Sequence, residues 1–252
     1  MSGSITASIM ITCLGDVFFP EVGVATVKLL RGLGVRVGFP AGQTCCGMPL
    51  FNSGYHDEAA RVAARTVDLF AGSAHVVVPS GSCAWMVKTE YAGLLRHDAR
   101  RRAAALDLAG RTRELSQFLV EVVGARTLMP SVTGTVTYHD SCHLLRGLGE
   151  SRAPRTLLRG LAGVELVELP GADECCGFGG SFSVRLPEVS SAILDKKLDN
   201  VERTGADCLV ACDAGCLMQM SGGLSRRRSR VKALHLAEVL AGGGAPGDGA
   251  LR

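Results

Sequence analysis

The strongest constraint in this sequence is an adjacent pair of cysteines that occurs twice, each time followed by glycine. Cys45-Cys46-Gly47 and Cys175-Cys176-Gly177 are separated by roughly 130 residues, and a repeat of this length defines the architecture of a chain. Single cysteines precede and follow both pairs at nearly the same spacing, at Cys13, Cys83, Cys142 and Cys216. The chain is therefore predicted to contain two copies of one cysteine-bearing unit.

Segments of strand-type composition recur together with the cysteines. Residues 4–13, 35–40 and 75–79 match 133–142, 164–170 and 207–211, and helical patterns lie between them, the last at 231–240. Alternating strands and helices predict an α/β fold with parallel sheets. We expect two pseudo-symmetric βαβ lobes, 1–128 and 129–252, each with a small parallel sheet and one cysteine motif. The glycine-rich tail, 242–252, is expected to be disordered.

The cysteines of each lobe follow predicted strands. Because open parallel sheets bind ligands at the carboxyl ends of their strands, the cysteines of one lobe are expected to converge there.

Composition excludes several classes of protein. A net charge of +3, without a basic stretch interleaved with aromatics, argues against a nucleic-acid-binding protein. No apolar run approaches the ~20 residues that a membrane helix needs. The N-terminus lacks the basic and apolar regions of a signal peptide, which predicts a cytoplasmic protein with reduced cysteines.

Adjacent cysteines can serve several kinds of site. Disulfides conflict with a reducing compartment. A single zinc ion usually takes Cys-x₂₋₄-Cys pairs, and neighbouring side chains on an extended backbone diverge. An iron–sulfur cluster has several irons for neighbouring thiolates to reach, and cysteine is its preferred ligand. Buried thiols without function would explain single cysteines, but not a repeated set of eight. The pattern favours iron–sulfur clusters, with zinc and disulfides as alternatives.

Several motifs resemble those of the lactate utilization protein A family. They include Gln43-Thr44-Cys45-Cys46-Gly47-Met48-Pro49, Pro79-Ser80-Gly81-Ser82-Cys83, Tyr138-His139-Asp140-Ser141-Cys142-His143 and Glu174-Cys175-Cys176-Gly177-Phe178-Gly179-Gly180. This family of CCG cysteine-rich proteins is related to the iron–sulfur subunit of glycolate oxidase and to the catalytic subunit of heterodisulfide reductase. The resemblance extends from about Ile9 to Leu240 and is carried by many motifs.

The resemblance implies a non-autonomous subunit of a cytoplasmic complex that oxidises L-lactate, or another 2-hydroxy acid, to the keto acid. The partners it implies are a ferredoxin-like iron–sulfur subunit and a third small subunit. It also implies up to one cluster per lobe, expected to be [4Fe–4S]. The implied ligands are Cys13, Cys45, Cys46 and Cys83 in one lobe and Cys142, Cys175, Cys176 and Cys216 in the other.

The chain departs from the heterodisulfide reductase pattern, in which each motif ends in Cys-x-x-Cys and supplies a fifth ligand. Ser80 and Asp213 stand where the additional cysteines would be, while Cys212 lies one residue before Asp213. Cys212 is a further ligand candidate, and Cys208 is expected in the core. Two other functions stay open: a cluster-dependent thiol–disulfide reductase, and a scaffold subunit that binds metal only to fold.

Other residues near the cysteines also have two interpretations each. His139 and His143 flank Cys142 and are candidates either for a role beside a cluster sulfur or substrate carboxylate, or for ordinary packing. Arg146 and Arg185 follow cysteine motifs and are candidates for a carboxylate clamp, because arginine binds carboxylates through two hydrogen bonds. Both are equally compatible with an exposed surface position.

Overall fold

The computed structural model describes residues 4–128 and 133–242. Lobe one is built from the following elements: β1 (Thr6–Ile9), α1 (Cys13–Phe18), α2 (Pro20–Gly32), β2 (Arg36–Gly38), α3 (Met48–Asn52), α4 (His56–Leu69), β3 (Val76–Val78), α5 (Gly81–Trp85), η1 (Met86–Glu90), α6 (Tyr91–Leu94), α7 (Ala99–Arg111), β4 (Thr112–Glu114), α8 (Leu115–Gln117) and η2 (Phe118–Val123).

Lobe two repeats much of this order. It contains β5 (Gly134–His139), η3 (His143–Gly147), α9 (Arg152–Arg159), β6 (Val164–Glu168), α10 (Ser181–Arg185), α11 (Pro187–Arg203), β7 (Cys208–Ala211), α12 (Ala214–Arg226), β8 (Lys232–His235) and α13 (Leu236–Leu240). The elements labelled η are π-helical turns.

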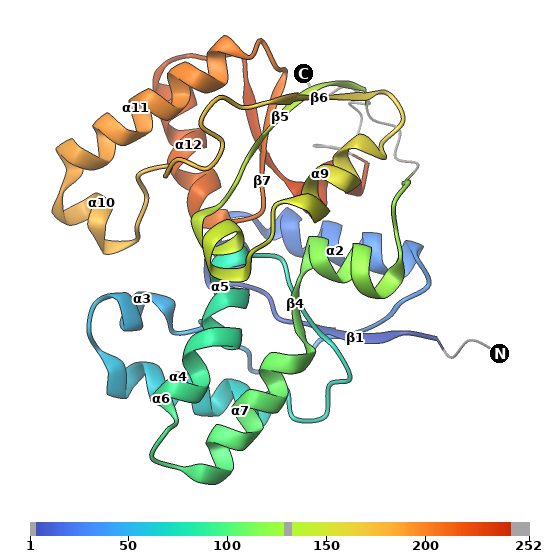
Figure 1. Ribbon diagram of the computed structural model, residues 1–252, viewed down its shortest axis with the longest axis vertical. Helices are drawn as coiled ribbons and strands as arrows, with labels where there is room; N and C mark the ends of the chain where they lie inside the picture. Colours follow the sequence, from blue (N-terminus) through green and yellow to red (C-terminus); the bar gives the residue numbers. More distant parts are fainter. Residues whose placement is uncertain (1–3, 129–132, 243–252) are drawn as a thin grey trace.

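Each lobe has one four-stranded sheet in which every pairing is parallel. The strand order is β2-β1-β3-β4 in lobe one and β6-β5-β7-β8 in lobe two, so the two sheets have the same topology. Lobe one forms the lower part of Figure 1 and lobe two the upper part. The predicted fold class, two pseudo-symmetric α/β lobes with parallel sheets, is confirmed.

The two lobes share one apolar core. Side chains on successive strand residues point to opposite faces of a sheet. In lobe one Ile9 and Val77 therefore enter the shared core while Val76 and Val78 face a second core; in lobe two Val210 enters the shared core. Helices extend this interface, since α13 of lobe two packs on α2 of lobe one and α8 packs on α9. The shared core and these helix contacts fix the position of the two lobes relative to each other.

The fourth strand of each sheet was not predicted. Residues 231–240 have the apolar spacing of a helix, but the structure divides them into β8 and α13 at His235, whose imidazole caps the helix by accepting from Ala237 N (3.0 Å). In lobe one, β4 has only three residues and follows α7 directly, which leaves no turn signal between them. Pairing with β3 and β7 makes these short segments strands.

The lobe boundary predicted between residues 128 and 129 adjoins residues 129–132, and the predicted disordered tail falls largely on 243–252; both stretches lie outside the described residues. Among the described helices, none has both the length and the apolar character needed to cross a membrane.

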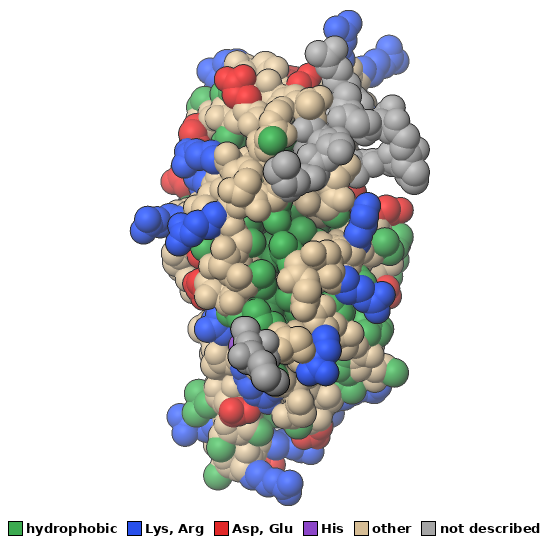
Figure 2. All heavy atoms as spheres, turned by 90° about the vertical axis from the view of Figure 1, so that its right-hand side faces the viewer, with side chains coloured by type: hydrophobic (Ala, Val, Ile, Leu, Met, Phe, Trp, Pro, Cys, Tyr) green, Lys and Arg blue, Asp and Glu red, His purple; other side chains and the backbone are tan. Residues whose placement is uncertain are grey.

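Hydrophobic side chains gather at the surface in the middle of one face, between the ends formed by the two lobes (Figure 2).

Candidate metal centre

The four predicted ligand cysteines of lobe one lie together beyond the carboxyl ends of three neighbouring strands. Cys13 begins α1 after β1, the cysteine pair lies in the loop after β2, and Cys83 lies in the first turn of α5 after β3. The Sγ atoms of Cys13 and Cys45 are 3.4 Å apart, and those of Cys46 and Cys83 are 3.2 Å apart. Residues distant in sequence thus form one thiol cluster.

Lobe two builds the equivalent cluster from the equivalent elements. Cys142 follows β5, the pair Cys175-Cys176 follows β6, and Cys216 lies in the first turn of α12 after β7. The Sγ atoms of Cys176 and Cys216 and a ring nitrogen of His139 all lie within 4.8 Å of one another. All ten cysteines of the chain are free thiols.

The glycine after each pair shapes the loop. Gly47 and Gly177 have φ values of 87° and 86°, a left-handed conformation that other residues adopt at a cost. Their amides donate to the Sγ atoms of Cys45 (3.4 Å) and Cys175 (3.3 Å). A Cβ at Gly177 would lie 2.6 Å from the carbonyl oxygen of Ser190. Glycine therefore allows the backbone to aim an N–H group at a sulfur in each lobe.

The thiols strongly perturb one another. The hydrogen bond from Cys13 lowers the pKa of Cys45, whereas that same bond and burial raise the pKa of Cys13. Cys175 and Cys142 behave in the same way in lobe two. One thiolate of each such pair is stabilised while its neighbour keeps a proton, since adjacent like charges repel. All four thiols can ionise together only around a positive charge, which is the condition of a metal site.

The helices that carry Cys83 and Cys216 are capped by residues that hydrogen-bond to each other across the lobes. Ser80 Oγ accepts from Cys83 N (3.3 Å) and donates to Asp213 Oδ2 (3.0 Å). The same Asp213 oxygen accepts from Ser82 N (2.9 Å), and its other oxygen accepts from Gly215 N (3.1 Å). Ser80 and Asp213, which stand where the heterodisulfide reductase pattern has further cysteines, thus form a clamp between the lobes.

Both thiol clusters border one cavity of about 260 Å³ between the lobes. It is lined by cysteines of both lobes, namely Cys13, Cys46, Cys83, Cys142, Cys175, Cys176 and Cys216. α5 packs on η3, and there the ring centroid of the Trp85 indole lies 4.8 Å from the ring centroid of the His143 imidazole. Gly147 lies against this indole so closely that a Cβ there would overlap the ring. The two clusters therefore face a common space.

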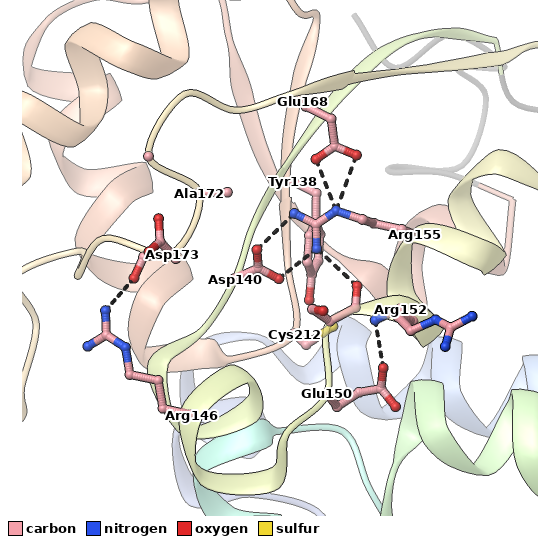
Figure 3. Close-up of polar contacts among 12 residues, drawn as sticks. Tyr138, Asp140, Arg146, Glu150, Arg152, Arg155, Glu168, Ala172, Asp173 and Cys212 are labelled. Carbon is pink, nitrogen blue, oxygen red and sulfur yellow. Dashed lines mark hydrogen bonds and ion pairs between the residues drawn. The ribbon is translucent and has the colours of Figure 1, made fainter.

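A polar network supports the loops of lobe two (Figure 3). The guanidinium of Arg155 donates to both carboxylate oxygens of Asp140 (2.8 Å each), through Nε to Glu168 (2.9 Å), and lies over the ring of Tyr138. Asp140 is buried and lies between His139 and Cys142 in the chain. The bidentate ion pair therefore holds the chain between His139, at the end of β5, and Cys142.

The two arginines considered for a carboxylate clamp have different positions. Arg146 donates to the backbone carbonyl of Asp173 (2.8 Å), which ties η3 to the loop before Cys175, and Arg185 is exposed at the end of α10. Neither lines the interlobe cavity. The structure gives Arg146 a role in supporting the cysteine loop.

The two remaining cysteines lie away from the cavity. Cys208 and Cys212 are fully buried in the shared core, and Tyr138 Oη donates to the Sγ of Cys212 (3.3 Å). Burial raises the pKa of both thiols, to about 12 for Cys208, which keeps them protonated. The predicted core position of Cys208 agrees with this arrangement, and Cys212, which directly follows β7, belongs to the shared core.

Sequence reasoning missed the clamp between Ser80 and Asp213. The signal was present, because both residues are N-cap types three positions before a cysteine, and N-caps precede helices. What the sequence could not provide was their contact across the two lobes.

The donor set fits the cofactor that the sequence predicts. Each lobe offers four converging thiols, the ligand chemistry of iron–sulfur clusters and of soft metals, together with backbone amides directed at sulfur. Lobe two adds a buried imidazole. The described residues therefore support metal or iron–sulfur binding.

Comparison with known proteins agrees with this arrangement. A cysteine-rich domain model, CCG, matches residues 7–88 and 136–221, one copy in each lobe. Lactate utilization protein A of Halalkalibacterium halodurans is 46% identical over 92% of this chain and 95% of its own length. The protein of the same name from Macrococcus caseolyticus is 47% identical over the same shares.

A solved structure shares the fold. A hypothetical protein from Helicobacter pylori matches 96% of this chain with a TM-score of 0.56 and 11% sequence identity, and the match spans 49% of that protein. At this identity the likeness concerns the fold alone. The family model and relatives go further: the chain belongs to the lactate utilization protein A family, with one CCG cysteine-rich domain in each lobe.

Proposed function

We propose that this protein is the iron–sulfur electron-transfer subunit of a cytoplasmic complex that oxidises L-lactate to pyruvate. The observation that carries the proposal is the pair of four-thiol clusters bordering one interlobe cavity. Lactate is proposed as the substrate because of the names of this chain's relatives. Two lactate utilization proteins A are 46% and 47% identical to it.

The ligands in this proposal are the thiolates of the two clusters. Cys13, Cys45, Cys46 and Cys83 would hold one iron–sulfur cluster, and Cys142, Cys175, Cys176 and Cys216 would hold the other. When bound, such a cluster supplies reversible one-electron transfer at a potential set by its ligands and their hydrogen bonds.

The chain itself contributes position and electrostatics. The amides of Gly47 and Gly177 donate to Cys45 and Cys175 and offset negative charge on these sulfurs. The clamp from Ser80 and Ser82 to Asp213 fixes the two cysteine-bearing helices relative to each other. A fixed separation across a shared cavity suits electron passage from one lobe to the other.

The oxidation of lactate itself is assigned to the complex rather than to this chain alone. Arg146 and Arg185 were the candidates for a carboxylate clamp, and both lie outside the interlobe cavity. The proposed partners are a ferredoxin-like iron–sulfur subunit and a third small subunit, which would deliver or receive the electrons.

The test uses the full chain purified without oxygen. Iron, sulfide and visible absorption near 400 nm are measured first, and L-lactate is then added with and without the two partner subunits. We expect lactate to bleach the absorption only when the partners are present. Bleaching by lactate with the chain alone would move the substrate site into this subunit, and reduction of a small disulfide by the chain alone would favour the reductase interpretation instead.

A further inference from the structure

His139 is a buried imidazole whose position is unusual for a residue of the core. It is the last residue of β5, none of its surface is exposed, and within the described part of the chain neither ring nitrogen hydrogen-bonds to a nitrogen or oxygen atom, while the Cys216 thiol lies beside the ring. Leaving a buried polar atom unpaired is destabilising, so such an atom calls for a ligand or partner. Packing alone does not account for His139.

The direction of the strand aims this imidazole at the lobe-two thiols. Tyr138 enters the shared core, and because side chains alternate along a strand, His139 faces the other side of the sheet. There one of its nitrogens and the Sγ atoms of Cys176 and Cys216 lie within 4.8 Å of one another. Three atoms able to bind metal thus converge from three different elements.

Lobe one differs at this position. Met10 stands three residues before Cys13, as His139 stands three residues before Cys142, and it is 2% exposed within an apolar core. The neighbouring hydroxyls differ in the same sense: Thr12 Oγ1 accepts from Gly15 N (3.1 Å), whereas the matching Ser141 hydroxyl is buried without a partner among the described residues. Unpaired polar atoms therefore accompany the cysteines in lobe two.

We propose that His139 is a nitrogen ligand of the lobe-two centre, which makes that centre a mixed cysteine–histidine site while lobe one keeps cysteine ligands only. This inference rests on the proposed function, in which the thiols hold iron. His139 would supply the fifth donor for which neither Asp213, in the clamp, nor Cys212, in the shared core, is placed.

A nitrogen donor in one lobe only makes the two centres unequal. The reduction potential of an iron–sulfur centre depends on its ligands and their hydrogen bonds. Because His139 is added to the four thiolates of lobe two, the two centres are expected to have distinct midpoint potentials.

The test measures nitrogen coupling to the iron centres by pulsed electron paramagnetic resonance of the reduced full chain. Protein is prepared with ¹⁴N-histidine and with ¹⁵N-histidine, which separates imidazole from backbone nitrogen. The variants take the residues of lobe one: His139→Met matches Met10, and the control His143→Leu matches Leu14. We expect directly bonded histidine nitrogen in the wild type and in His143→Leu, and its loss in His139→Met together with a shifted midpoint potential for one centre only.

Each alternative outcome overturns a different statement. Iron without bonded histidine nitrogen in the wild type, or nitrogen that persists in His139→Met, would refute the ligand role while leaving the proposed function intact. Absence of iron from the wild type would overturn both. If His139→Met does not fold, the isotope comparison in the wild type and in His143→Leu still decides the question.

Discussion

Two sheets of identical topology carry identical sets of four cysteines in this molecule, but the residues around the two sets differ. Lobe one has Met10 where lobe two has His139, and Ser80 where lobe two has Asp213. At the end of the fourth strand Glu114 caps a helix in lobe one, and His235 does so in lobe two. The parallel sheet thus fixes where the thiols lie, while single substitutions at matched positions give each lobe its own chemistry.

The largest expected effect is the loss of one lobe's metal. Cys45→Ala and Cys175→Ala remove matched ligands from opposite lobes. Because the two thiol clusters share no residue, each variant should lose about half of the iron of the wild type. Iron assays of both variants, purified without oxygen, measure this. If either variant loses all of its iron, the centres are not independent and the comparison fails.

The second effect concerns the matched buried caps. Burial raises the pKa of Glu114 to about 7, so the folded state holds its proton more tightly and this contribution to stability is lost as the pH rises from about 4.5 to 7. Burial lowers the pKa of His235 to about 4, so its contribution grows as the pH rises through 4 to 6.5. The two contributions oppose each other between about pH 4.5 and 6.5.

Glu114→Gln separates these contributions. It keeps an oxygen to accept from Ser116 N and removes the titration, so its stability relative to wild type should increase by up to about 3 kcal/mol between pH 5 and 8. Urea unfolding of both proteins across this range gives the difference, and His235→Asn should show the opposite slope at acidic pH. A difference that does not vary with pH would show that Glu114 does not titrate in this window.

The third effect tests the clamp between the lobes. Asp213 accepts three hydrogen bonds, two of them from lobe one, whereas Ser80 donates one to it and has its other two hydrogen bonds within lobe one, with Cys83 N and Ser82 Oγ. Asp213→Ala should therefore lower the free energy of unfolding by about 3 kcal/mol and Ser80→Ala by about 1 kcal/mol. Denaturant unfolding monitored at Trp85 measures both. Equal losses would mean that the clamp is no stronger than an ordinary helix cap.

The smallest expected effect is steric. A Cβ at Gly81 would lie 2.7 Å from Leu144 Cβ, while the matched position in lobe two is already Ala214. Gly81→Ala should cost about 2 kcal/mol, and Ala214→Gly less than about 1 kcal/mol. Thermal unfolding of the two variants compares them. An unchanged melting temperature for Gly81→Ala would show that α5 and η3 can separate without cost.

The sequence predicts the parts of this molecule that depend on local pattern and repetition. The cysteine spacing and the β-type runs are enough for two parallel α/β lobes, because strand carboxyl ends collect residues that are distant in the chain. The short strands β4 and β8 escape prediction, since three or four residues become a strand only by pairing with a neighbour.

Contacts between the lobes are also beyond the sequence. Cys212 directly follows β7 and His139 is the last residue of β5, yet Cys212 enters the shared core beside Tyr138 while His139 faces the thiols. To predict these two positions, one must know which face of each strand packs against the neighbouring elements. The clamp from Ser80 to Asp213 joins residues of two repeats in the same way.

The most direct test of two unequal iron–sulfur centres is a redox titration of the oxygen-free full chain, followed by electron paramagnetic resonance and combined with iron and sulfide assays. We expect iron and sulfide in both lobes and two transitions with distinct midpoint potentials, of which the lobe-two transition is absent from Cys175→Ala. Iron and sulfide near zero would contradict the metal assignment. A single transition shared by both lobes would contradict the difference between them.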